Sequence, residues 1–217
     1  MRLTSLIFKT LLGAVLLFTS LPVAAQGSRQ NQGPPPPPKA PAYRIASDAS
    51  APAGWNRYEF GAGPVVSALL PSRPEEFKEI KSLGASKPST MYTYISDAEG
   101  AVYGVYYGED MPFIAERMPE SFRQGFYEGM LKGFIEGVKQ GLAASGLLFE
   151  VNVGSRRQTK VDGLDGNEFD FGFGPMSGLA RMTISGQRAY MAIAMWTEDA
   201  PQSERNSFFR SFRIIKR

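Results

Sequence analysis

A glycine stands at every fourth position in the middle of this chain. The segment from Pro119 to Gly146 reads PESFRQGFYEGMLKGFIEGVKQGLAASG. Its spacing predicts one long amphipathic helix, because every repeat glycine is followed directly by an apolar residue. Four residues advance about 400° on a helix, so the glycine row drifts by about 40° per step. The drift puts Gly125 and Gly129 beside the apolar face, and Gly133, Gly137 and Gly141 within it.

This repeat is costly for a helix. Five glycines lower helix stability by roughly 4–5 kcal/mol relative to alanine, so a close approach of another backbone should offset them. That approach is tight packing on the protein's own sheet, helix–helix contact in a homodimer, or insertion at a membrane surface. The predicted partner or ligand surface consists of Gly129, Gly133, Gly137, Phe126, Met130 and Phe134, with Tyr103 and Tyr106 from a neighbouring hairpin.

Runs with two-residue alternation on both sides of the helix predict strands. The runs cover residues 55–60, 65–70, 91–96, 101–107, 147–155, 166–173, 179–185 and 188–196. Short turns separate the first two runs, the tyrosine-rich third and fourth runs, and the last two runs, so each of these pairs predicts a hairpin. Ser72, Pro74 and Glu75 have the form of a helix start and predict a short helix up to Gly84. A closing helix is expected over residues 202–211. The predicted fold class is α+β, with a mostly antiparallel sheet of about seven strands sandwiched between helices.

The first half-hundred residues have the composition of targeting and linker sequence. Residues 1–25 read as a secretory signal, with Arg2 and Lys9 before an apolar run and Ala25 at the cleavage site. A retained anchor is the alternative. Residues 26–52 include five consecutive prolines and predict a disordered tether, more simply a passive linker than a proline-motif ligand or wall spacer. Residues 53–217 form a single domain.

Composition narrows the compartment and the chemistry. The chain has 24 basic and 21 acidic residues, and removing the signal with its two basic residues leaves a net charge of +1. We therefore expect an exported protein, periplasmic or extracellular, with no nucleic-acid partner and no stable membrane span after cleavage. The sequence contains no cysteine and no histidine, which excludes thiolate chemistry, His/Cys metal sites and imidazole catalysis. We predict no cofactor, no metal and no catalytic residue.

Three groups of polar residues could have a function. Glu168 and Asp170 stand two apart on a strand and could act as a carboxylate pair in glycoside hydrolysis, and Asp162, Asp165 and Asn167 could form a weak calcium loop. Alternation instead favours a solvated face opposite three phenylalanines, with ordinary turn residues nearby. The basic residues Arg156, Arg157 and Lys160 could meet an anionic lipid or polymer, but a solvated loop is the simpler interpretation.

Short motifs along residues 54–215 resemble the PsbP-like superfamily of α/β/α-sandwich domains, which includes the extrinsic oxygen-evolving subunit of photosystem II. The matching residues are Gly54-Trp55 with Tyr58-Glu59-Phe60, Leu70-Pro71 and Pro74, Gly163 to Phe169, Arg188-Ala189-Tyr190, and Ser207 to Phe212. The resemblance implies an antiparallel sheet between helices and a non-catalytic, partner-binding role. It supplies no active site, and Asn167 stands where an arginine often follows the glycine of this turn.

Three hypotheses of function result. The first is an exported, non-enzymatic interaction or scaffold module of the cell envelope with a protein partner. The second is a carrier or sensor of a small apolar ligand, held between the long helix and the tyrosine-rich hairpin. The third is a carboxylate-dependent hydrolase that uses Glu168 and Asp170.

Overall fold

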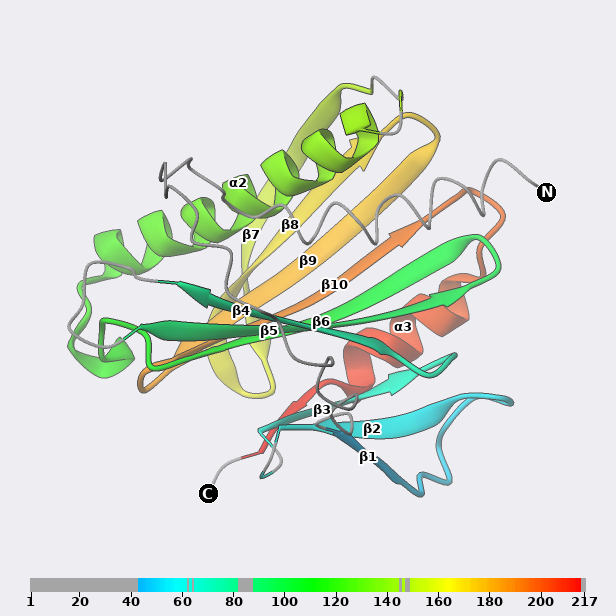
Figure 1. Cartoon of the computed structure of the whole chain (residues 1–217), viewed down its shortest axis with the longest axis horizontal. Helices are drawn as coiled ribbons and strands as arrows, with labels where there is room; N and C mark the ends of the chain where they lie inside the picture. The colour runs from blue at the N-terminus through cyan, green and yellow to red at the C-terminus, as the bar shows by residue number, and fades with distance from the viewer. Residues whose placement is uncertain are drawn as a thin grey trace, which may run out of the picture.

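The computed structural model describes residues 43–61, 63, 65–81, 88–144, 146 and 149–215. The predicted signal and the proline tether up to residue 42 lie outside these residues. The described strands form two antiparallel sheets (Figure 1). The small sheet has the order β1-β2-β3-β11, with β1 (Tyr43–Ala46), β2 (Asn56–Phe60), β3 (Val66–Leu70) and β11 (Arg213–Ile214).

The large sheet has the order β4-β5-β6-β10-β9-β8-β7. Its strands are β4 (Glu75–Lys81), β5 (Ser89–Ala98), β6 (Ala101–Glu109), β7 (Val151–Val161), β8 (Leu164–Phe173), β9 (Met176–Ser185) and β10 (Arg188–Trp196). The helical elements are the 3₁₀ turn η2 (Ala115–Arg117), α2 (Glu120–Ala144) and α3 (Gln202–Ser211). None of the helices in the described ranges is long and apolar enough to cross a membrane.

The large sheet is the middle layer of the fold. The helix α2 covers one of its faces, and α3 with the small sheet covers the other (Figure 1). Two apolar clusters fill the two interfaces, so the central strands β6 and β10 are buried on both faces. This confirms the predicted α+β class, the antiparallel sheet and the sandwich arrangement.

Most predicted elements are present close to their expected bounds. The long helix and the closing helix form as predicted, and β5–β6 and β9–β10 form the two expected hairpins. Gly100 and Gly186 have positive φ of 73° and 57° in the two turns, a backbone conformation that glycine adopts without steric cost. The strand after α2 begins later than predicted, at Val151, and continues to Val161.

The short helix predicted from Ser72 to Gly84 is wrong. Its described part is the strand β4, which pairs with the outer edge of β5 from Glu75↔Ile95 to Lys81↔Ser89. Ser72 does not cap a helix there. Its hydroxyl lies 2.9 Å from the Ser96 hydroxyl and accepts a hydrogen bond from the Asp97 amide, so it fastens the bend before β4 to β5.

The boundary predicted at residue 53 is too late. Residues 43–46 already form a strand, in which Tyr43 pairs with Phe60 and Ala46 with Arg57. The first predicted hairpin, now β2–β3, belongs to the small sheet and not to the seven-stranded one. One face of the large sheet is therefore covered by a second sheet together with α3, where helices alone were expected.

Candidate functional site

The start of α2 is fastened to the turn between β9 and β10. The Met111 amide donates to the Gln187 carbonyl (3.0 Å), and the Ala115 amide donates to the Gly186 carbonyl (2.8 Å). In return, the Gly186 amide donates to the carboxylate of Glu116 (3.1 Å). These bonds fix the segment from Met111 to Glu116, which leads through η2 into α2, against the β9–β10 turn.

Burial changes steadily along the glycine row of α2. Gly125 and Gly129 are exposed, Gly133 is half-buried and Gly137 is buried. A Cβ added at Gly125 or Gly129 would have no neighbouring atom within 4 Å. The predicted drift of the row into the apolar face is confirmed for these four positions, while the burial of Gly141 lies outside the described residues.

The large side chains of the predicted surface lie at different depths. Phe134 is fully buried, with its ring centroid 6.2 Å from that of Tyr106 and 5.6 Å from that of Phe171. Met130 and Phe126 are half-buried at the border of the core. Only the part of the predicted surface nearest the start of α2 is therefore open to solvent.

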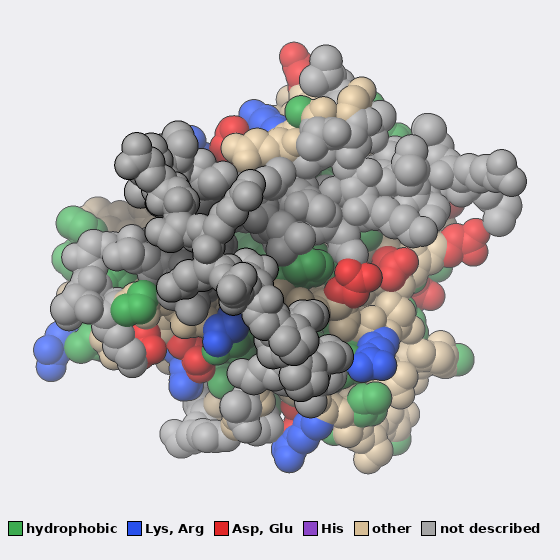
Figure 2. Space-filling model, viewed as in Figure 1, with side chains coloured by type: hydrophobic (Ala, Val, Ile, Leu, Met, Phe, Trp, Pro, Cys, Tyr) green, Lys and Arg blue, Asp and Glu red, His purple; other side chains and the backbone are tan. Residues whose placement is uncertain are grey.

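Four apolar side chains gather at that end of the helix, and we call them the apolar end of α2: Phe113, Ile114, Phe122 and Phe126. Phe122 is 72% exposed and Ile114 is 38% exposed. The Phe113 and Phe126 rings are 4.8 Å apart, and Phe126 follows Phe122 by one helical turn. Figure 2 shows hydrophobic side chains at the left edge of the molecule, where Figure 1 places the start of α2.

The two tyrosines predicted to share a surface lie on opposite faces of the large sheet. Tyr106 faces α2, whereas Tyr103 packs on the other face between Trp55 and Phe208, with both ring centroids at 5.1 Å. The prediction that both contribute to one site beside the helix is wrong. Successive side chains of β6 point to opposite faces of the sheet, and Tyr103 and Tyr106 are three residues apart. Burial raises the pKa of Tyr103 above its usual range, so its hydroxyl stays neutral and the ring serves packing.

Glu168 is buried, although alternation predicted a solvated position. Its carboxylate accepts hydrogen bonds from Arg157 Nε and Arg181 Nε, each at 2.5 Å, from the strands on either side. Burial alone would raise the pKa of Glu168, but the hydrogen bonds from Arg181 and Arg157 outweigh it and lower the pKa. A general acid in glycoside hydrolysis needs a raised pKa, so this geometry gives no support to the hydrolase hypothesis.

The oxygen groups of the suggested calcium loop point to different partners. Asp162 accepts from the Ile214 amide (2.7 Å), Asp165 accepts from Lys160 (2.6 Å), and the Asn167 side chain donates to Gln124 of α2 (2.7 Å). Across the described ranges, no three Asp or Glu side chains lie together in a way that could hold a metal ion.

The basic patch of β7 is also divided among partners. Arg156 reaches across to Glu128 and Gln124 of α2, Arg157 binds Glu168, and Lys160 binds Asp165. Its charges are thus largely neutralised by neighbouring carboxylates. The patch is not the solvated loop that was expected, because it lies on an ordered strand.

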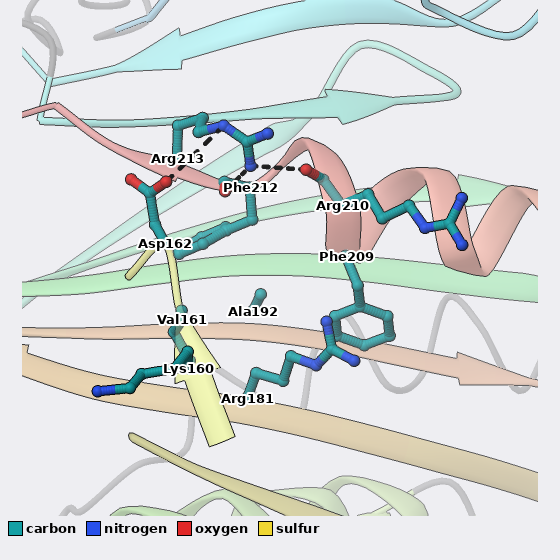
Figure 3. Close-up of a pocket in the computed structure, with 9 residues that line it drawn as sticks. All are labelled: Lys160, Val161, Asp162, Arg181, Ala192, Phe209, Arg210, Phe212 and Arg213. Atoms are coloured by element: carbon teal, nitrogen blue, oxygen red, sulfur yellow. Dashed lines mark hydrogen bonds and ion pairs between the residues drawn. The ribbon is translucent and has the colours of Figure 1, made fainter. Parts of the chain in front are cut away.

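A cavity of about 180 Å³ lies on the side of the large sheet opposite α2, against the C-terminal end of α3 (Figure 3). We call it the α3 pocket. Its walls are formed by Lys160, Val161, Asp162, Arg181, Ala192, Phe209, Arg210, Phe212 and Arg213. Four of these residues are cationic and one is anionic. Sequence reasoning missed this site, although the motif Ser207 to Phe212 contains three of its residues.

Arg181 and Arg213 occupy opposite sides of the α3 pocket (Figure 3). Arg181 stacks on Phe209, with its guanidinium carbon 4.8 Å from the ring centroid. Arg213 donates to the carbonyl groups of Arg210 (2.6 Å) and Phe212 (2.8 Å), and its Nε lies 3.7 Å from the Asp162 carboxylate. Residues far apart in the chain therefore build the pocket, which explains why no local motif predicts it.

Comparison with known proteins gives a likeness of fold to solved structures. No model of a known protein family matches the chain, and no curated protein matches it in sequence. Among solved structures, the chain is similar to the solution structure of cyanobacterial PsbP (CyanoP) from Synechocystis sp., with a TM-score of 0.47 and 12% identity. The match covers 78% of this chain and 98% of that one. The likeness concerns the fold alone.

Proposed function

We propose that this protein is an exported, non-enzymatic interaction module of the cell envelope that binds a partner protein through the apolar end of α2. The observation that carries the proposal is the 72% exposure of Phe122, beside the half-buried Phe126 and the 38% exposed Ile114. Single exposed apolar residues are ordinary on protein surfaces. A group of aromatic side chains on one helix end is a typical protein contact.

Two further features of this end favour a protein partner. The hydrogen bonds between residues 111–116 and the β9–β10 turn hold the segment that carries Phe113 and Ile114 in place before binding, which lowers the entropic cost of association. Gly125 and Gly129 present open backbone on the neighbouring surface of the helix, so a partner can approach closely there. The predicted signal of residues 1–25 supports the envelope as the compartment.

The test places a photo-crosslinking side chain at position 122 in the protein expressed with its own signal in its own cells. Position 45 is the matched control, because Ile45 is 63% exposed on the small sheet, away from α2. We expect one discrete crosslinked envelope protein from position 122 and none from position 45. Gly129→Leu, which fills the open helix surface, should abolish that product.

Equal crosslinking from both positions, or none from position 122, would contradict the proposal. A crosslinked product at twice the mass of the chain would identify the partner as a second copy. Sedimentation velocity over a range of concentrations then has to show a homodimer that Phe122→Ser dissociates.

A further inference from the structure

We infer that the α3 pocket binds a small oxyanion, a carboxylate or a phosphate group, through the guanidinium of Arg181 and the cations at its rim. This site lies on the face of the large sheet opposite α2 and is independent of the proposed protein contact. The inference rests on the way Arg181 is held, on the charge around the cavity, and on its apolar floor.

Arg181 is fixed in place and retains donors for a ligand. Its Nε donates to Glu168, and its guanidinium lies on the face of the Phe209 ring. A guanidinium has more N–H donors than one carboxylate can accept, so some remain available at the cavity. Both contacts restrict the side chain before a ligand arrives, which favours the two-point hydrogen bonding that arginine makes with oxyanions.

The charges around the cavity leave a positive excess. Glu168 is shared between Arg157 and Arg181, and Arg157 also lies 3.6 Å from Asp170. Lys160 is paired with Asp165, and Arg213 with Asp162. The positive excess is therefore the charge of Arg210. Arg210 makes no ion pair within the described part of the chain, and Figure 3 shows its side chain extending outward from the rim. An exposed arginine at the rim of a small cavity can turn toward a bound anion, and its charge attracts anions before they bind.

The floor of the cavity is apolar. The floor is formed by Val161, Ala192 and Phe212, each of which is less than 5% exposed. It lies between Arg181 and Arg213. Charge interactions are stronger beside such a floor than in open water, because water screens them less. The size of about 180 Å³ suits a phosphate ion or a small organic acid better than an extended chain.

The test titrates inorganic phosphate and, separately, benzoate into the exported protein, followed by NMR shifts of the β9, β10 and α3 backbone. We expect saturable shifts around residues 181, 192 and 209 with at least one of the two anions. Arg181→Lys keeps the charge but loses the planar donor pair, and it should weaken binding by about tenfold or more. The two titrations distinguish a phosphate ligand from a carboxylate ligand.

Two further variants keep the test decisive if Arg181→Lys lowers stability. Arg210→Gln should weaken binding about two- to threefold and reduce its salt dependence, because the residue acts through its charge. Phe209→Leu removes the stacking partner without touching Glu168 and should also weaken binding. The matched control is Arg117→Gln, an exposed arginine in η2 on the α2 side of the sheet, which should bind like the wild type.

The absence of saturable shifts with both anions would overturn the inference. Binding that Arg181→Lys, Arg210→Gln and Phe209→Leu all leave unchanged would overturn it as well. Phe122→Ser separates this site from the proposed protein contact, because it should leave anion binding intact.

Discussion

Gly166 shows how one position inside a short motif supports the sheet. A Cβ built on Gly166 would lie 2.2 Å from the Met182 carbonyl oxygen and 3.1 Å from Val161 Cγ2. Because the first of these atoms is backbone, a side chain could be accommodated only by moving β8 away from β9. The motif from Gly163 to Phe169 therefore includes a glycine that close strand packing requires.

We predict that Gly166→Ala lowers the free energy of unfolding by about 1–3 kcal/mol, the usual cost of overpacking. Gly172→Ala on the same strand is the control, because its Cβ would meet the Met176 carbonyl oxygen at 3.2 Å and needs a smaller adjustment. Urea unfolding of both variants measures the difference. Equal losses would show that the approach of β9 to Gly166 has no special role.

At the scale of elements, two glycines of α2 should respond to substitution in opposite ways. Gly125 lowers the stability of the helix, whereas Gly137 is required by packing. Gly125 is exposed, so Gly125→Ala should raise helix stability by about 1 kcal/mol. Gly137 is buried, so Gly137→Leu should lower the free energy of unfolding strongly, because the larger side chain has to displace packed atoms. Thermal and urea unfolding of the two variants check these opposite signs, and effects of the same sign would contradict the drift of the row.

The elements also show what sequence patterns could and could not predict. Alternation and turn glycines located β5–β6 and β9–β10, because those hairpins are local in the chain. The strand β4 was missed because Ser72, Pro74 and Glu75 match a helix start. The outer edge of β5 offers backbone groups that need partners, and β4 satisfies them through pairs such as Lys78↔Tyr92. This strand pairing depends on tertiary structure, and it outweighs the helix-start pattern of residues 72–75.

The two candidate sites also differ in how far local sequence patterns predict them. The apolar end of α2 contains one residue of the predicted surface, Phe126, whereas Phe113, Ile114 and Phe122 were not predicted. The α3 pocket needed β7, β9, β10 and the end of α3 to meet, and Glu168 was expected to be exposed because its arginine partners stand on other strands. Local periodicity contains no information about such pairings.

At the scale of the whole molecule, Arg57 connects three segments of the layer that the small sheet and α3 form. These are the turn at Asp48, the strand β3 and the end of α3. Its Nε donates to Asp48 (2.6 Å), and its Nη1 donates to the Ser67 hydroxyl (3.2 Å) and to the Ser211 carbonyl at the end of α3 (3.0 Å). Ser211 in turn accepts from the Leu69 amide (2.8 Å) through its hydroxyl. Asp48, within the segment expected to be a disordered tether, is therefore one anchor of this layer.

This network predicts a specific loss of stability in acid. Hydrogen bonds from the Ser50 hydroxyl and amide, and then the bond from Arg57, lower the pKa of Asp48 from 3.8 to about 2. A lowered pKa means that the ionised carboxylate stabilises the folded state above pH 3.8, and that this contribution is lost as the pH falls toward about 2.

Asp48→Asn should be less stable than the wild type at neutral pH, and its stability should fall less steeply across that window. Ser50→Ala should lie between the two, because it removes the leading hydrogen bond and leaves Arg57 in place. Unfolding free energies from urea titrations at a series of pH values measure these slopes, and identical slopes for all three proteins would show that Asp48 does not anchor the layer.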